Sequence, residues 1–214
     1  PAPIAITSVA FSPDGAQLAT GGYHEVLIWD IATGKLVKRL QGLPERTYAI
    51  RFSPNGWWIA TASGTPAQSG VVRLWDAKTG ELIRDLIEVE DSVFALTFSP
   101  DSKLLASGGC DRTIRIWDLA SGRLAKSIED HADWVLDLDF SPDGSRLVSG
   151  SRDKTSKVFD VAKGESIVTF PEHTEPVYAV AFAKDGKSIA TAGGDKVIKV
   201  WDPAAEGKKI RDIG

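Results

Sequence analysis

Short apolar runs alternate with turn residues along the chain, and no stretch shows the 3.6-residue spacing of an amphipathic helix. The clearest example lies near the middle of the sequence. Four runs rich in Val, Ile, Leu, Phe and Thr follow one another there, at Val93–Phe98, Leu104–Ser107, Thr113–Trp117 and Leu124–Ile128. Gly, Pro, Asp or Ser bounds each run, which is typical of strands joined by tight turns. The pattern predicts four short antiparallel strands and an all-β fold.

The same pattern recurs five times at a nearly constant period, which indicates a repeat architecture. Each repeat has a Phe at the end of its first apolar run, and successive anchors are separated by 41, 46, 42 and 42 positions. The longer spacing comes from an insertion, Gly64 to Gly70, in one hairpin loop. The third run ends in Trp-Asp in repeats one, two, three and five, and it ends in Phe159-Asp160 in repeat four. The anchors are Phe11, Phe52, Phe98, Phe140 and Phe182, and the pairs begin at Trp29, Trp75, Trp117 and Trp201.

Tight turns are predicted after the anchor residues. Asp-Gly or Asn-Gly follows the anchor in four repeats, and such pairs tolerate the positive φ of hairpin turns. The third repeat has Asp101-Ser102 instead, so we expect a looser turn there.

Four antiparallel strands per repeat predict the blade of a β-propeller, because one blade needs stacked neighbours to bury both faces of its sheet. The SPDG and Trp-Asp signatures resemble those of the WD40 repeat family over nearly the whole chain. The resemblance implies an all-β WD40 β-propeller domain, 1–214, with five four-stranded antiparallel blades. The expected blades are residues 5–41, 46–87, 92–129, 134–171 and 176–213.

The number of blades leaves three arrangements open. WD40 propellers commonly have seven blades, so the resemblance favours a segment of a larger propeller. A closed five-bladed ring and an oligomer that pools blades through open blade faces are the alternatives. The chain begins Pro-Ala-Pro and contains no Met, so we expect an excised domain or a processed chain.

A narrower resemblance is to bacterial multidomain proteins in which a cytochrome-c-like domain precedes a WD40 domain. It implies export to the periplasm, although the sequence itself does not distinguish that compartment from the cytoplasm. No Cys-x-x-Cys-His motif occurs, so any haem would lie outside this chain, and we expect no cofactor in it. The resemblance rests on GGYHEVLIWD (Gly21–Asp30), GLPER (Gly42–Arg46), GTPAQSGVVRLWD (Gly64–Asp76), HADWVLD (His131–Asp137) and SRDKTSKVFD (Ser151–Asp160).

Composition narrows the kinds of partner. Lys plus Arg number 25 against 29 Asp plus Glu, so the net charge of −4 argues against a nucleic-acid backbone as the main partner. No apolar stretch approaches the 18 residues of a membrane span. Cys110 is the only cysteine, so an internal disulfide is excluded and the redox compartment stays undecided.

Two histidines occupy the same repeat position, nine residues before the anchor Phe. In WD40 blades such a His bonds a Ser or Thr of the second strand, an Asp of the next hairpin and, through them, the third-strand Trp. A catalytic His/Asp/Ser set is the alternative, but recurrence from blade to blade favours a structural network. Blades one to three have Ala2, Leu43 and Val89 there, and His24 is interpreted as a surface-loop residue, not a metal ligand. The network set is His131, Ser149, Asp153, His173, Thr191, Asp195 and Trp201.

The resemblance also implies a partner-binding rim at the mouth of the central channel, formed by the starts of the first strands and the neighbouring hairpins. Exposed aromatic and Arg side chains around a concavity are typical interface anchors. The alternative is that the three aromatics of the first strands fill the inter-blade core and that Trp134 is buried under a loop. The predicted rim is Arg46, Tyr48, Phe94, Cys110, Trp134, Leu136, Arg152 and Tyr178.

These observations favour a protein-interaction scaffold that binds a peptide or a partner domain. The alternative is an accessory propeller that supports a fused redox or other catalytic domain outside the chain. A self-contained enzyme is disfavoured, since the sequence shows no phosphate-binding Gly loop, nucleophile elbow or metal-binding His pair. We therefore predict no catalytic residues and no metal site.

Overall fold

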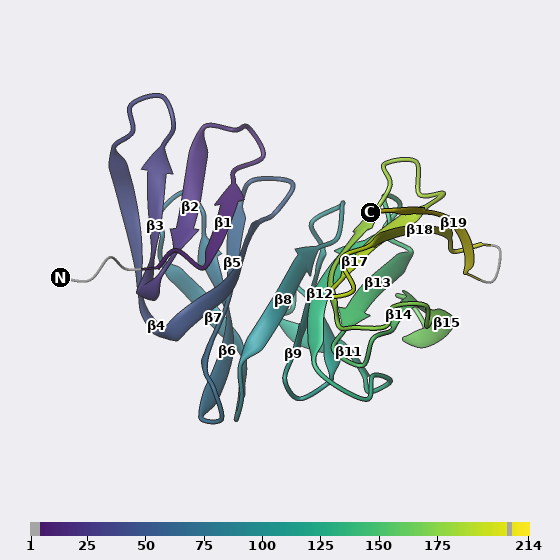
Figure 1. The fold of residues 1–214 in the computed structure, drawn as a ribbon. Helices are drawn as coiled ribbons and strands as arrows, with labels where there is room; N and C mark the ends of the chain where they lie inside the picture. Colours follow the sequence, from purple (N-terminus) through teal and green to yellow (C-terminus); the bar gives the residue numbers. More distant parts are fainter. Residues whose placement is uncertain (1–4, 205–206) are drawn as a thin grey trace. The chain divides into compact units, whose positions relative to one another are not determined.

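The computed structural model describes residues 5–204 and 207–214, and every regular element in these ranges is a β-strand (Figure 1). The prediction of an all-β fold is confirmed for this part of the chain. Two compact units divide the sequence, residues 1–98 and residues 99–214.

The first unit contains one antiparallel sheet of seven strands in sequence order, followed by an eighth strand. Most of these strands contain Val, Ile, Thr or aromatic residues, which favour a pleated, partly buried surface. The strands are β1 (Ser8–Phe11), β2 (Gln17–Gly21), β3 (Tyr23–Asp30), β4 (Leu36–Phe52), β5 (Trp58–Thr65), β6 (Ser69–Asp76), β7 (Leu82–Val89) and β8 (Val93–Phe98).

Strand β4 departs from the expectation, which separated the first two blades at residues 42–45. It runs unbroken for 17 residues and pairs with β3 along one part and with β5 along the other. His24 in β3 has a φ of 62°, and the β3–β4 register shifts at this residue. Beyond the shift, Tyr23 pairs with Arg46, so the ladder crosses the expected loop and joins two predicted blades in one sheet.

The second unit contains two four-stranded antiparallel sheets, β12–β15 and β16–β19, each in sequence order. Strand β10 lies between β9 and β11 and pairs antiparallel with both. The bounds are β9 (Leu104–Gly109), β10 (Ile114–Asp118), β11 (Arg123–Ile128), β12 (Val135–Phe140), β13 (Arg146–Ser151), β14 (Ser156–Asp160), β15 (Glu165–Phe170), β16 (Val177–Phe182), β17 (Ile189–Gly193), β18 (Ile198–Asp202) and β19 (Lys208–Ile213).

Small residues let neighbouring sheets of the second unit approach closely. A Cβ added at Gly108 would lie 2.6 Å from Val135 Cγ1 and 3.4 Å from Leu138 Cδ1. At Gly150, an added Cβ would lie 2.9 Å from Val180 Cγ1. Branched side chains of each first strand therefore fill a space that a glycine of the preceding sheet leaves open.

Side-chain acceptors add polar links between the same sheets. Two carboxylates of β12 accept backbone N–H groups of β16. Asp137 Oδ2 accepts the Val180 N–H at 2.9 Å, and Asp139 Oδ2 accepts the Phe182 N–H at 2.8 Å. These bonds satisfy donors on the edge of β16 that does not pair with β17, and they hold the two sheets in register. Apolar packing and hydrogen bonding therefore act together at this contact.

Side chains also close the turn after each first strand. In the third repeat, Ser99 Oγ donates to Asp101 Oδ1 at 2.7 Å and accepts the Leu104 N–H at 2.9 Å. Ser102 takes a φ of 60°, and its N–H bonds to the Ser99 carbonyl at 2.9 Å. The prediction of a looser turn here is wrong, because the Ser99–Asp101 pair holds the tight turn and Ser102 adopts the left-handed conformation of glycine.

Candidate partner-binding site

The loop before β12 is tied to the β13–β14 hairpin by a buried histidine. His131 Nδ1 lies 2.7 Å from Asp153 Oδ2, and His131 Nε2 lies 2.6 Å from Ser149 Oγ. The Asp153 carboxylate also accepts the Ala132 N–H at 3.0 Å and the Thr155 hydroxyl at 2.6 Å. Burial raises the pKa of Asp153, but the hydrogen bonds with His131 and Thr155 outweigh it and hold the pKa well below its usual value.

The fifth repeat contains the same arrangement around His173. Its Nδ1 lies 2.9 Å from Asp195 Oδ2, and its Nε2 lies 2.8 Å from Thr191 Oγ1. Burial raises the pKa of Asp195, but hydrogen bonds with His173 and the Thr174 N–H outweigh it, so this pKa is also lowered. Both histidine side chains are completely buried.

Trp201 does not join this network as the resemblance implied. Its indole Nε1 is buried and has no hydrogen-bond partner in the described part of the chain. The ring stacks flat on Phe170 instead, with centroids 4.6 Å apart. In the third repeat the equivalent Trp117 Nε1 does donate to Ser107 Oγ, at 3.3 Å. Aromatic packing on Phe170 therefore holds the Trp201 ring in place, whereas a hydrogen bond to Ser107 holds Trp117.

The repeats without the histidine are held differently. Leu43 is buried in the core of the first unit and Val89 is half-buried, whereas Ala2 lies outside the described residues.

His24 is exposed, and its Nδ1 lies 3.3 Å from the Leu43 carbonyl. No cluster of three or more His, Cys, Asp or Glu side chains able to hold a metal ion occurs in residues 5–204 and 207–214.

Trp134 and Arg152 come together at the start of β12. The Arg152 guanidinium lies over the indole ring, with Cζ 4.4 Å from the ring centroid. The backbone joins the same residues, because the Arg152 N–H donates to the Trp134 carbonyl at 2.9 Å. Arg152 Nε also lies 3.5 Å from Asp133 Oδ2, and the Arg152 side chain is 48% exposed. The pair is thus fixed in place and remains partly open to solvent.

Leu136 and Tyr178 occupy equivalent β-bulges. The β12–β13 register skips Leu136, and the β16–β17 register skips Tyr178. A bulge redirects the side chain of the extra residue and is common next to functional sites. Leu136 is half-buried, whereas Tyr178 is 59% exposed and lies against Gly194 of the next hairpin.

The remaining predicted rim residues have different surroundings. In the first unit, Tyr48 also lies at a bulge, and its ring meets Phe94 edge to face with centroids 4.9 Å apart. Both rings are half-buried, and Arg46 is exposed in β4. Cys110 is half-buried in the β9–β10 hairpin of the second unit. The structure thus pairs Trp134 with Arg152 and Tyr48 with Phe94.

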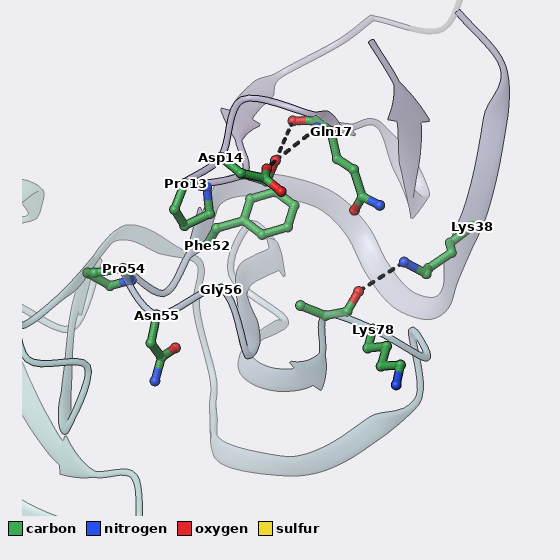
Figure 2. Close-up of a pocket in the computed structure, with 11 residues that line it drawn as sticks. Pro13, Asp14, Gln17, Lys38, Phe52, Pro54, Asn55, Gly56 and Lys78 are labelled. Carbon is green, nitrogen blue, oxygen red and sulfur yellow. Dashed lines mark hydrogen bonds between the residues drawn. The ribbon is translucent and has the colours of Figure 1, made fainter. Parts of the chain in front are cut away.

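Sequence reasoning missed a pocket of about 400 Å³ in the first unit (Figure 2). Asp14, Asn55 and Lys78 lie in three turns that line the pocket. Lys38 also lines it, and its Nζ donates to the Ala77 carbonyl at 3.0 Å. Asp14 is committed to its own turn through the Ser12 hydroxyl and the Ala16 N–H, and these bonds lower its pKa. No signal in the repeat pattern points to this pocket, because its lining combines turn residues of two repeats with Gln17, Lys38 and Phe52 of the adjoining strands.

Comparison with known proteins identifies the repeats. Residues 2–30, 80–118, 122–160 and 164–202 match the family model described as WD40: WD domain, G-beta repeat. Residues 31–79 fall outside the matched ranges, and they contain both the continuous strand β4 and the insertion in the second repeat. No helix of the described residues is long and apolar enough to cross a membrane.

Short stretches of the chain are similar to eukaryotic proteins. The identity is 41% over 59 residues with small ribosomal subunit protein RACK1z of Arabidopsis thaliana, covering 27% of this chain and 18% of that protein. It is 41% over 58 residues with pre-mRNA-processing factor 19 of Oryza sativa subsp. japonica, covering 27% and 11%. It is 41% over 58 residues with the intraflagellar transport protein 122 homolog of Danio rerio, covering 27% and 5%.

The chain spans less than a fifth of the length of these relatives. Their eukaryotic sources give no support to the resemblance to bacterial cytochrome-linked proteins, which stays a prediction. The family model matches well over half of the residues, in four separate ranges that each end at an aromatic-Asp pair. The chain therefore belongs to the WD40 repeat family.

Proposed function

We propose that this chain is a protein-interaction scaffold and that the end of the second unit carrying Trp134 and Arg152 binds a peptide or a partner domain. The observation that carries the proposal is the stacked, partly exposed pair of these two side chains. Trp and Arg are among the residue types most enriched in binding hot spots. Leu136 and the exposed Tyr178, each redirected by a bulge, extend the proposed surface along the starts of β12 and β16.

Preorganisation supports this role. The cation–π contact and the Arg152–Trp134 backbone bond hold both residues before any partner arrives. In addition, the His131 network joins the preceding loop to the hairpin that carries Arg152. A site that is already ordered loses less conformational entropy on binding, which favours affinity.

A binding role fits the histidine networks better than a catalytic one. His131 and Ser149 could suggest a base and a nucleophile, but both side chains are completely buried. A substrate therefore has no access to the Ser149 hydroxyl. One relative is named as a ribosomal subunit protein, and a role within an assembly is consistent with the proposed scaffold.

The test uses a displayed library of random peptides selected against the 214-residue chain. The selected peptide with the highest affinity is then titrated against the wild type, Trp134→Ala and Arg152→Ala. We expect each variant to weaken binding by about 2 kcal/mol, or roughly thirtyfold, as for hot-spot residues. Unfolding midpoints should change little, because both side chains are partly exposed.

Trp57→Ala is the matched control, because this exposed tryptophan lies in a turn of the first unit. It should leave the dissociation constant unchanged. Unchanged binding by both Trp134→Ala and Arg152→Ala would contradict the proposed site. A loss with Trp57→Ala alone would move the site to the first unit.

A further inference from the structure

The pocket of the first unit contains a half-buried positive charge that no carboxylate neutralises. Lys38 Nζ donates to the Ala77 carbonyl at 3.0 Å. An ammonium group has three N–H donors, so two remain for another acceptor. Within residues 5–204 and 207–214, Lys38 forms no ion pair. By contrast, the largely buried Lys157 and Lys199 side chains lie 3.0 and 3.8 Å from carboxylate oxygens. An anion in the pocket would therefore stabilise the charge of Lys38.

Gln17 and Phe52 lie beside this ammonium group. Both residues are half-buried and line the pocket together with Lys38. Figure 2 shows the Gln17 amide and the Lys38 ammonium group directed toward the same space, with the Phe52 ring next to it. The amide N–H groups of Gln17 can donate to an anion, and the Phe52 ring offers an apolar surface. This part of the pocket thus combines hydrogen-bond donors with an aromatic contact.

The exposed charges of the lining leave an excess of positive charge. They are Lys78 and Asp14. The Asp14 carboxylate already accepts the Ser12 hydroxyl at 2.6 Å and the Ala16 N–H at 3.0 Å. The lining therefore has two cationic side chains and one anionic side chain, and the anionic one is committed to its own turn.

An equivalent pocket of the second unit, also of about 400 Å³, has balanced charges. Lys126 occupies the place of Lys38 there. A Cβ added at Gly80 would lie 3.4 Å from Lys38 Cδ, and one added at Gly164 would lie 3.4 Å from Lys126 Cδ. Lys126 also lacks an ion pair in the described part of the chain, but Asp160 lines its pocket. One lysine and one aspartate are the charged residues of this second lining.

Two other positions make the pocket of the first unit more polar. Gln17 stands where the second unit has Leu104, and Lys78 stands where it has Ala162. Each difference places a hydrogen-bond donor where the other pocket has an apolar side chain. A few polar groups in an apolar cavity determine which ligand it accepts. The donors of the first pocket favour a ligand with acceptor atoms and negative charge.

We propose that the pocket of the first unit binds a small organic anion. The oxyanion, a carboxylate or a phosphate, accepts hydrogen bonds from Lys38 and Gln17, and the apolar part of the ligand lies against Phe52. Lys78 adds electrostatic attraction. A hydrogen bond between an ammonium group and an oxyanion is stronger than one between neutral groups. The volume of about 400 Å³ is typical of small-molecule sites.

The experiment titrates the nitrogen-15-labelled chain with phenyl phosphate and with phenylacetate, followed by NMR. Backbone amide signals of Phe52, Gly56 and Lys78 should shift, whereas those of Gly144 and Ala162 in the equivalent pocket should not. Binding of one anion alone identifies the oxyanion that the pocket takes. Benzyl alcohol, which has the ring without the charge, should bind about tenfold more weakly. Inorganic phosphate, which lacks the ring, should bind more weakly than phenyl phosphate.

Lys38→Met and Gln17→Leu are the test variants, and Lys126→Met is the matched control. Lys38→Met should raise the dissociation constant about tenfold, because it removes a charged donor. Gln17→Leu should weaken binding less, since it removes a neutral donor, and it tests the site independently if Lys38→Met fails to fold. Lys126→Met should leave the dissociation constant unchanged. Thermal unfolding shows which variants are folded.

Three results overturn the proposal. The first is the absence of shifts with both anions. The second is equal binding of benzyl alcohol and the anions, or of inorganic phosphate and phenyl phosphate. The third is an equal loss with Lys126→Met and Lys38→Met, which would show non-specific attraction of anions to lysines. The outcome is independent of peptide binding at Trp134, because none of these variants alters that surface.

Discussion

The fourth and fifth repeats follow nearly the same sequence pattern and form equivalent four-stranded sheets, yet their side chains have different environments. Phe140 is buried and Phe182 only half-buried, although both are anchor residues. Ser156 of β14 is completely buried, whereas the equivalent Ile198 of β18 is 42% exposed. A shared sequence pattern thus produces the same sheet, while the presence of a neighbouring sheet determines how much each position contributes to stability.

The anchor residues should show the largest difference between the two repeats. Phe140→Ala should lower the free energy of unfolding by about 4 kcal/mol, since it creates a cavity in a packed core. Phe182→Ala should cost about 2 kcal/mol, because the half-buried ring loses fewer contacts. Urea unfolding followed by tryptophan fluorescence measures both. Equal losses would contradict the link between neighbouring sheets and stability.

The histidine networks should differ less. His131→Ala should cost about 3 kcal/mol, because it removes one buried hydrogen bond from Asp153 and one from Ser149. His173→Ala should cost about 2 kcal/mol, because the bonds that it removes are longer. Thermal unfolding of the two variants measures the difference, and a larger loss for His173→Ala would show that bond length is the wrong criterion.

Acid should weaken the same network. The folded-state pKa of Asp153 lies below its usual value of 3.8, so its ionised form stabilises the fold above about pH 4. That stability is lost as the pH falls toward the lowered pKa. Asp153→Asn should therefore be less stable than the wild type at neutral pH and should show a shallower loss on acidification between pH 4 and 2. Parallel pH profiles for the two proteins would exclude this contribution.

The smallest effect should be at Trp201. Its indole N–H has no partner in the described chain, and the fourth repeat already has Phe159 at this position. Trp201→Phe should therefore change stability by less than about 1 kcal/mol. Trp117→Phe should cost about 1.5 kcal/mol, since it leaves the buried Ser107 hydroxyl without its donor. A greater loss at Trp201 would indicate that ring size, not the hydrogen bond, controls stability here.

Much of the proposed site could be anticipated from repeat positions alone. The same spacing that aligns the anchor residues places Trp134 before β12 and Arg152 in the adjacent hairpin. Their cation–π contact could not be predicted, because it depends on the rotamers of two side chains and on the competing Asp133. The bulges at Leu136 and Tyr178 also escape the pattern, since an extra residue in one strand leaves the apolar spacing nearly intact.

The sequence by itself determined the strands and turns of this protein, because apolar alternation and turn residues act over a few neighbouring positions. The repeat spacing also placed His131 and His173 at equivalent positions, and the resemblance to WD40 blades implied their aspartate partners. Only the tertiary structure decided that Ser102 closes a tight turn, that β4 joins two predicted blades and that Trp201 stacks on Phe170. It also decided that Phe182 is only half-buried where Phe140 is buried. Burial depends on which sheet lies alongside, and a local pattern that is identical in both repeats contains no information about that neighbour.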